Sequence, residues 1–265
     1  MKNQILIASI TTAGMFGTTA HAASVIGLNL NNNDGAGAQV GQSTFGATWT
    51  DVTGANGPSG ADLVLNGTSN AVNADWAASN FWLAGSWTGT DGFNSAIGTM
   101  RAYLDDGDNP AAGSPVDLGA ANGDGIGVSI RLEGLATWLA NEGATGYTIT
   151  VYQSTDSENA SFRELSIRDG GSVTSSVLDT LTVTAAGNGT WDGTSNDPLG
   201  NITSGTRGAG TFSSTFNQDV ITLTSASRSG SSRGTVAAVV VTAVPEPGSL
   251  ALLGMGGLAF VRRRR

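Results

Sequence analysis

The amino-acid sequence predicts an all-β protein folded as an antiparallel β-sandwich. Stretches in which apolar and polar residues alternate recur along most of the chain, as expected for strands with one buried face. Glycine accounts for 39 of the 265 residues. Each glycine inside a helix costs about 0.5–1 kcal/mol, which disfavours a helical fold. Clusters of Asn, Asp, Gly and Pro separate the alternating stretches without helix-length crossovers, so neighbouring strands are expected to run antiparallel.

The clearest strand is residues 126–133, where apolar and polar residues alternate and one face is expected to be solvated. Residues 147–152 alternate in the same way, with threonine outward and β-branched or aromatic residues inward. Trp138 and Leu139 follow Leu135 by three and four residues, which predicts a short helix over residues 135–141. Further strands are predicted at residues 25–30, 44–50, 178–184, 211–216, 220–224 and 236–242, for a total of about ten to twelve.

The N-terminal residues have the pattern of a secretory signal peptide. Lys2 supplies a positive charge, residues 5–16 are mostly apolar, and Ala20-His21-Ala22 is a small-x-small cleavage site. We expect cleavage after Ala22. The apolar run is shorter than the ~20 residues that a membrane-spanning helix needs, so it is interpreted as a separate signal helix.

The C-terminal residues form a second signal. Pro245-Glu246-Pro247 precedes an uncharged apolar stretch, residues 250–261, and the chain ends in four arginines, Arg262, Arg263, Arg264 and Arg265. Terminal arginines hold their end of an apolar helix on the cytoplasmic side, so the arginines act as a membrane stop. Counted from Gly248, the apolar helix rises about 21 Å, short of a ~30 Å hydrocarbon core, which suits a transient anchor.

The Pro-Glu-Pro motif, the short apolar helix and the arginine cluster together resemble the PEP-CTERM sorting signal of Gram-negative bacteria. The resemblance implies recognition by an exosortase, removal of the tail, and delivery to the cell surface or an exopolysaccharide matrix. An ordinary C-terminal membrane anchor is the alternative. The predicted organisation is a signal peptide at 1–22, a β-sandwich domain at 23–243 and a sorting signal at 244–265.

A second resemblance covers parts of the central domain. Residues 101–105, 128–135, 147–169 and 220–241 are similar to uncharacterised secreted β-sandwich modules that precede PEP-CTERM tails. The order of these segments implies a jelly roll of the galactose-binding type. No activity follows from this resemblance.

The charge of the central domain excludes nucleic acid as a partner. Removing Glu246 from the 21 acidic residues, and Lys2 with the four terminal arginines from the 12 basic ones, leaves 20 acids against 7 arginines, a net charge of −13. Such a surface repels phosphate backbones. Contact with the membrane is expected only through the two terminal signals.

The residue inventory also disfavours an enzyme. The chain has no cysteine, and its single histidine, His21, lies in the signal peptide, so catalytic triads and histidine or cysteine metal sites are excluded. Paired carboxylates could still hydrolyse glycosidic bonds, and Glu133, Glu142, Glu158 and Glu164 are the glutamates available. Because none of them has a distinctive motif, we expect no catalytic residue and interpret these carboxylates as solvated surface groups.

Two binding sites are proposed from the sequence. Asp105, Asp106, Asp108 and Asn109 place several oxygen ligands in one loop, which makes calcium the one candidate cofactor; acidic residues of a simple turn are the alternative. Most of the six tryptophans are expected in the core, with Trp76, Trp82 and a third at position 87 in one hairpin.

Trp191 beside Asp192 is the candidate for contact with an extracellular polysaccharide, because sugars pack on indole rings and bind carboxylates through their hydroxyls. The sequence therefore predicts an exported surface or matrix protein with a structural or weak glycan-binding role. A passive coat component and a polysaccharide hydrolase are the alternatives.

Overall fold

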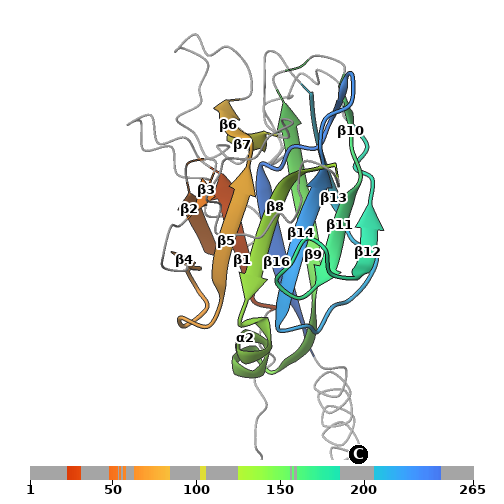
Figure 1. The fold of residues 1–265 in the computed structure, drawn as a ribbon. Helices are drawn as coiled ribbons and strands as arrows, with labels where there is room; N and C mark the ends of the chain where they lie inside the picture. The colour runs from red at the N-terminus through yellow and green to blue at the C-terminus, as the bar shows by residue number, and fades with distance from the viewer. Residues whose placement is uncertain are drawn as a thin grey trace, which may run out of the picture. The chain divides into compact units, whose positions relative to one another are not determined.

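The computed structural model confirms a protein built mostly from β-strands, which form two sheets packed face to face (Figure 1). In Figure 1 the seven-stranded sheet lies in front and the five-stranded sheet behind it. The structure describes residues 23–30, 48–52, 54, 56–57, 63–83, 102–105, 125–155, 157, 160–185 and 206–245.

The five-stranded sheet contains β1 (Val25–Leu30), β2 (Thr48–Val52), β9 (Ala144–Thr155), β13 (Thr206–Thr211) and β16 (Ala238–Pro245). Its order is β13-β9-β16-β1-β2, so the first strand of the domain lies beside the last one. All neighbours are antiparallel except β1 and β2, which run parallel. The segment between them is long enough for the crossover that parallel strands require.

The seven-stranded sheet contains β3 (Asn56–Gly57), β4 (Leu63–Val64), β5 (Asn73–Ala78), β8 (Ile126–Glu133), β11 (Leu165–Asp169), β12 (Val177–Leu181) and β14 (Val220–Ala226). Its order is β12-β11-β14-β8-β5-β3, and β4 also pairs with β5. All of these pairs are antiparallel.

Two small ladders and one helix complete the described elements. β6 (Asn80–Leu83) pairs with β7 (Ala102–Asp105) in antiparallel fashion, and β10 (Ser161–Phe162) pairs with β15 (Ser232–Arg233) in parallel fashion. The predicted short helix is confirmed as α2 (Leu135–Glu142), which buries Leu135, Trp138 and Leu139. Gly134 and Gly143 flank this helix in the left-handed conformation, with φ of 81° and 62°.

Side chains from both sheets meet in one continuous apolar core. Ile26, Ile149 and Val241 enter it from the five-stranded sheet, and Ile130 and Leu223 enter it from the seven-stranded sheet. Each of these side chains is at most 2% exposed. Full burial of one such side chain contributes about 1.5–3 kcal/mol, so the alternating residues of these strands supply the main driving force for sheet packing.

The outer face of the five-stranded sheet has two halves. Trp49 and Tyr103 cover one half, where they pack with Tyr152, Ala238 and Val240 in a second apolar cluster. The other half carries Thr148, Thr150, Thr211 and Thr242 on three neighbouring strands, which we call the threonine face; among the described residues, no apolar cluster of this kind covers it.

Several strand predictions are corrected. Parallel pairing of β1 with β2 and of β10 with β15 departs from the predicted antiparallel arrangement. Sixteen strands are present in the described part of the chain, more than predicted, because four two-residue strands leave no alternation to recognise. The predicted strands at 178–184, 211–216 and 236–242 are displaced, since the observed strands are 177–181, 206–211 and 238–245. Of the strand predicted at 44–50, residues 48–50 belong to β2 and residues 44–47 lie outside the described residues.

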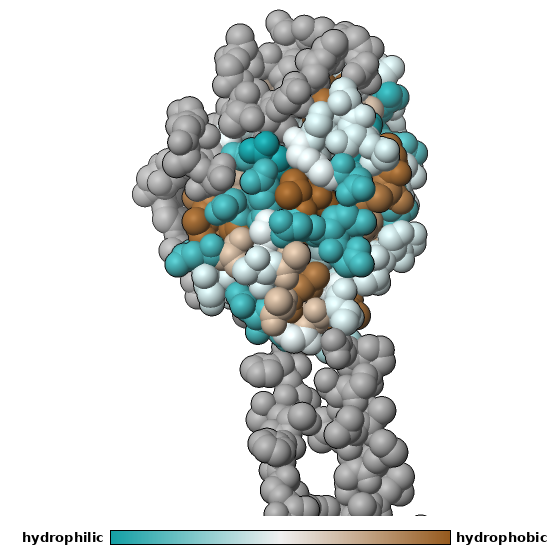
Figure 2. Space-filling model, turned by 60° about the horizontal axis from the view of Figure 1, so that its bottom comes forward, coloured by the Kyte–Doolittle hydropathy of each residue, from teal (hydrophilic) through white to brown (hydrophobic). Residues whose placement is uncertain are grey.

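The solvated outer face predicted for residues 126–133 is wrong for the first half of β8. Residues 126–130 are all buried, including Ser129. The reason is the loop after β11, because its Val173 packs against Ala77 and Ile126. Elsewhere in the described ranges, the large apolar side chains that are exposed, Val64 and Val177, lie apart on different strands. Figure 2 likewise shows apolar residues scattered among polar ones on the face it presents.

The chain divides into two compact units, residues 23–245 and the two terminal segments 1–22 and 246–265. Strand β16 therefore extends two residues past the domain limit predicted at residue 243. The predicted signal helix and C-terminal hydrophobic helix lie outside the described residues. Within the described ranges, no helix has the length and hydropathy needed to cross a membrane.

Candidate functional site

The Pro-Glu-Pro motif begins inside the last strand of the sheet. In β16, Val244 lies opposite Gly146 of β9 and Pro245 lies opposite Ala144, with a register shift between these two pairs. Proline has no N–H to donate to a ladder, so it suits the terminal position of a strand. Pro245 is exposed, while Glu246 and Pro247 lie outside the described residues. The first motif residue is thus part of the folded domain.

The end of β16 is anchored from β9 by Tyr147, which lies opposite Ala243. The Tyr147 side chain is fully buried, its ring centroid lies 5.9 Å from that of Phe216, and its hydroxyl donates to the Gln218 carbonyl at 3.1 Å. Burial raises the pKa of Tyr147 well above its usual value, and the negative charges of Asp219 and Asp169 raise it further. The phenol is therefore neutral at physiological pH.

The start of β1 lies directly beside this strand end. The Ala243 N–H donates to the Ser24 carbonyl at 2.9 Å, and Val25 lies opposite Thr242. The predicted cleavage residues Ala20 and Ala22 lie outside the described part, which begins at the exposed Ala23. The residues that follow the predicted signal cleavage and those that precede the sorting motif are consequently hydrogen-bonded neighbours.

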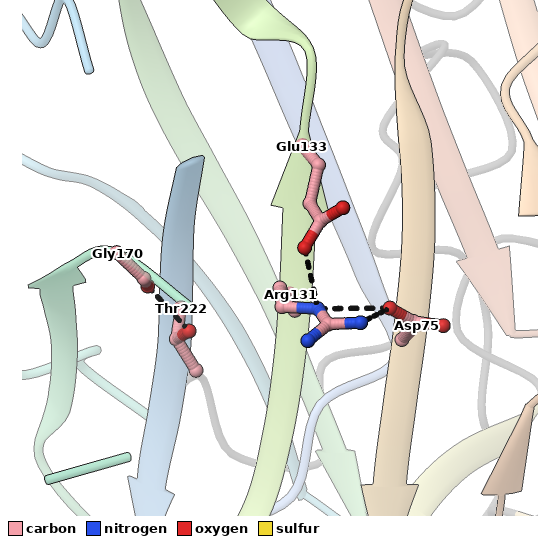
Figure 3. Close-up of polar contacts among 5 residues, drawn as sticks. All are labelled: Asp75, Arg131, Glu133, Gly170 and Thr222. Carbon is pink, nitrogen blue, oxygen red and sulfur yellow. Dashed lines mark hydrogen bonds and ion pairs between the residues drawn. The ribbon is translucent and has the colours of Figure 1, made fainter. Parts of the chain in front are cut away.

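An ionic cluster occupies the outer face of the seven-stranded sheet (Figure 3). Arg131 on β8 donates from its Nε to Asp75 Oδ2 on β5 at 2.9 Å, and its Nη2 contacts the same oxygen. Glu133 Oε1 lies 3.0 Å from Arg131 Nε. The Asp75 side chain is 3% exposed and that of Glu133 is 32% exposed. One guanidinium thus compensates a buried and a half-exposed carboxylate.

The loop after β11 is tied to the same face. Thr222 on β14 donates from its hydroxyl to the Gly170 carbonyl at 2.8 Å, as drawn in Figure 3. Arg168 donates to the Thr224 hydroxyl at 3.2 Å and to the Ser175 carbonyl at 2.9 Å. These contacts fix the loop over the sheet. Arg131 thus links β8 to β5 through Asp75, and Arg168 links β11 to the loop at Ser175.

The candidate hydrolytic glutamates can be placed in part. Glu133 belongs to the ionic cluster, Glu142 ends α2, Glu164 is exposed, and Glu158 lies outside the described residues. The pairing of Glu133 with Arg131 was not expected from the sequence. The polar face predicted for Glu133 agrees with its half-exposed position.

The proposed calcium loop is described only at its first residue. Asp105 ends β7 opposite Asn80 and is half-buried, whereas Asp106, Asp108 and Asn109 lie outside the described residues. In the ranges that the structure describes, no three acidic or histidine side chains gather as a metal site.

The predicted glycan contacts Trp191 and Asp192 also lie outside the described residues, as do Arg262, Arg263, Arg264 and Arg265. Trp49, Trp76 and Trp138 are buried, as predicted for most tryptophans. Trp76 donates from its indole N–H to the Gly54 carbonyl at 2.9 Å. The predicted shared hairpin is corrected: Trp76 lies on β5 and Trp82 on β6, whose partner is β7.

Sequence reasoning missed the Asp75–Arg131 pair, although both residues stand in alternating strands. The two residues are 56 positions apart in the chain, and their contact depends on the register that places Asp75 opposite Arg131. The sequence shows only that an acidic residue and a basic residue stand on two strands whose side chains alternate. Alternation does not determine the register that places them opposite each other.

Comparison with known families bears out the C-terminal signal. Residues 243–265 match the PEP-CTERM protein-sorting motif. A motif of this kind implies export, association with the cell surface, and recognition by an exosortase. No curated protein and no solved structure matches the chain.

Proposed function

We propose that this protein is a structural component of the cell surface or the exopolysaccharide matrix, released there after transient anchoring in the inner membrane. The observation that carries the proposal is the direct continuation of β16 into the sorting motif. β16 is an interior strand of the five-stranded sheet, and its last residue, Pro245, is the first residue of the Pro-Glu-Pro motif. The sandwich is then the cargo, and the tail is the part that directs it.

A structural role is favoured over hydrolysis by the way the carboxylates are used. A glycosidase needs one acid kept protonated and a second carboxylate facing the same substrate. Here Arg131 lies between Asp75 and Glu133 and compensates both charges. The fold of the domain is proposed to be a jelly roll, which is consistent with strands that pass repeatedly between the two sheets.

Weak binding of a neutral polysaccharide is the second candidate, favoured by the threonine face. Thr148, Thr150, Thr211 and Thr242 offer hydroxyls on one face of three neighbouring strands, and Thr150 and Thr211 are themselves hydrogen-bonded at 2.8 Å. Sugar hydroxyls can exchange hydrogen bonds with these threonine hydroxyls. Trp191 and Asp192 would add further contacts to the sugar. Single-site binding is expected near the millimolar range, about −4 kcal/mol, and becomes useful through multivalency.

The sorting proposal is tested in the native host with the full chain. Replacing Pro245, Glu246 and Pro247 by alanine should leave an unprocessed, membrane-retained form, because the exosortase loses its recognition motif. Pro198→Ala, outside the motif, serves as the control and should be processed normally. Surface delivery of the triple variant with the mass of the mature protein would refute the proposal.

The glycan candidate is separated from a purely structural role by retention on immobilised neutral polysaccharide. Thr148→Glu with Thr242→Glu places two charges on the threonine face and should abolish retention, whereas Ser231→Glu, in an exposed turn, should not. Trp191→Ala with Asp192→Ala tests the other predicted contact. If the unaltered protein shows no retention on any polysaccharide tested, the structural role stands without glycan binding.

Calcium binding by Asp105, Asp106, Asp108 and Asn109 is also a proposal, like glycan binding. Ca²⁺ takes six to eight oxygen ligands from flexible loops, and a bound ion raises the melting temperature by mass action. A calcium titration followed by thermal unfolding should therefore give a shift that Asp106→Ala with Asp108→Ala removes. An equal melting temperature with and without calcium removes the ion from the proposal.

A further inference from the structure

The first and last strands of the domain, β1 and β16, pair with each other in the five-stranded sheet. β16 lies between β9 and β1, and within the described part β1 and β2 join the rest of this sheet only through β16. The hydrogen bonds of the β1–β16 pair run from Ala243 N–H to the Ser24 carbonyl at one end to Leu30 N–H to the Ala237 carbonyl at the other. The sheet is incomplete until residues 238–245 are in place.

This topology sets an order of events during export. A chain that enters the exported compartment from its N-terminus delivers β1 first and β16 last. Among the described strands, β1 pairs only with β2 and β16, so β2 is its one ladder partner there until β16 arrives. Once residue 245 has emerged, the described sandwich can form while the tail is still attached, because every strand of its two sheets ends by residue 245.

The strand end also limits where the tail can be cut. Val244 and Pro245 are held opposite Gly146 and Ala144, and Tyr147 anchors the preceding Ala243. A protease needs an extended, unpaired segment, and strand residues paired with β9 do not supply one. Cleavage within the paired end of β16, at Val244 or Pro245, is therefore disfavoured in the folded protein.

We propose that folding precedes tail removal, so that the exosortase acts on the finished sandwich and cuts beyond the end of β16. The proposal rests on the proposed function, since it assumes that the tail is removed. Removal is written as hydrolysis: one peptide C–N bond after Pro245 breaks, and water supplies the hydroxyl of the new carboxyl group and the hydrogen of the new amine.

An engineered disulfide can report β1–β16 pairing, because the natural chain has no cysteine. The Ala243–Ser24 hydrogen bond makes residues 24 and 243 a hydrogen-bonded pair, so Val25 and Thr242 occupy the adjacent non-hydrogen-bonded position. Side chains at such a position lie close together, as a disulfide requires. Both residues are half-buried on the outer face, where Val25 packs against the second apolar cluster, so replacement leaves the core between the two sheets intact.

The experiment uses the full chain with Val25→Cys and Thr242→Cys, expressed in the native host and followed by pulse–chase with thiol-alkylating mass tags. Val25→Cys with Val244→Cys is the matched control, since residue 244 is two positions out of register and beyond the reach of a disulfide. The tail-bearing precursor and the tail-less product are separated by mass, and the oxidised fraction of each is measured.

The expected result is a disulfide already present in the tail-bearing precursor, with an oxidised fraction about tenfold above that of the out-of-register control. The oxidised precursor should lose its tail at the same rate as the reduced one. A precursor that stays reduced until its tail is gone overturns the proposal, as does an oxidised precursor that accumulates uncut. A tail that is never removed in any variant, including the natural chain, instead refutes the proposed function.

Discussion

Arg131 on β8 donates two hydrogen bonds to a single carboxylate oxygen of Asp75 on the neighbouring strand β5. The Asp75 carboxylate is almost fully buried, and the arginine compensates its charge. A buried charge that loses its partner is costly, whereas a half-exposed one is not. The two carboxylates on Arg131 should therefore differ in their importance to stability.

Arg131→Ala should lower the free energy of unfolding by about 3–5 kcal/mol, because it removes the guanidinium that faces the buried Asp75 carboxylate. Glu133→Gln keeps the arginine and removes only the half-exposed contact, so it should cost about 0–1 kcal/mol. Denaturant unfolding of both variants measures the difference. Equal losses would mean that Asp75 is not the partner that matters.

The two glycines beside α2 offer a second test. Both have positive φ, but a Cβ at position 134 would lie 1.9 Å from the Ala71 carbonyl oxygen, whereas one at position 143 meets nothing within 4 Å. Gly143→Ala should cost about 1–2 kcal/mol from the left-handed backbone alone. Gly134→Ala adds a backbone overlap that no rotamer change relieves, so it should cost at least about 1–3 kcal/mol more.

Thermal unfolding of the two glycine variants, made separately, gives this comparison. Helical content by circular dichroism is the control, because both substitutions leave α2 itself unchanged. Similar melting temperatures for the two variants would contradict the close approach of Ala71 to the start of the helix.

The sequence predicted those elements whose own residues determine them. Alternation over residues 126–133 and 147–152 identified β8 and β9, and the spacing of Leu135, Trp138 and Leu139 identified α2. Pairing partners could not be predicted in this way. The parallel β1–β2 pair and the Asp75–Arg131 contact depend on which strands become neighbours and in what register, which long-range packing decides.

The candidate site shows the same division. The Pro-Glu-Pro motif was recognisable from local residue order, whereas its start inside β16 was not, because Val244 and Pro245 acquire strand structure through Gly146 and Ala144 of β9. Proline cannot donate to a strand ladder, so Pro245 favoured a domain limit before the motif, at residue 243. The strand in fact ends at Pro245.

Alkaline pH should destabilise the protein through Tyr147. Its pKa in the folded state is raised, so the stability that this neutral phenol contributes is complete below pH ~10 and is lost as the pH rises above that value. Tyr147→Phe removes the hydrogen bond to Gln218, at a cost of about 0.5–1.5 kcal/mol near neutral pH. The variant should then lose less stability than the natural protein between pH 9 and pH 11.

Denaturant unfolding across this pH range tests the Tyr147 prediction, with spectrophotometric titration of tyrosinate as the control. Ionisation of Tyr147 near the ordinary tyrosine pKa of ~10 in the folded protein would contradict its burial.

Acidic pH should act through Asp179 on β12. Its partial burial would raise its pKa, but hydrogen bonds from Ser214, Thr180 and Ser213 outweigh this effect, and the pKa is lowered. A lowered pKa means that the stabilisation is present above pH ~4 and is lost as the pH falls through the folded-state pKa. Asp179→Asn should flatten that acid limb of the stability profile, and an unchanged limb would contradict the role of these hydrogen bonds.

The end of β16 predicts where a stable domain can be cut. A chain of residues 23–245 keeps the pairs Val244–Gly146 and Pro245–Ala144, whereas residues 23–243 leave the start of β9 without its neighbour. We expect the shorter chain to be less stable by about 1 kcal/mol, the typical net value of one lost backbone hydrogen bond. Both should give circular dichroism spectra of a β protein with little helix, since the described strands and the single described helix lie within residues 25–245. Residues 23–247 serve as the control and should match 23–245 in urea unfolding, because both chains contain the whole of β16. Equal stability of all three chains would show that the ladder beyond residue 243 contributes nothing to the fold.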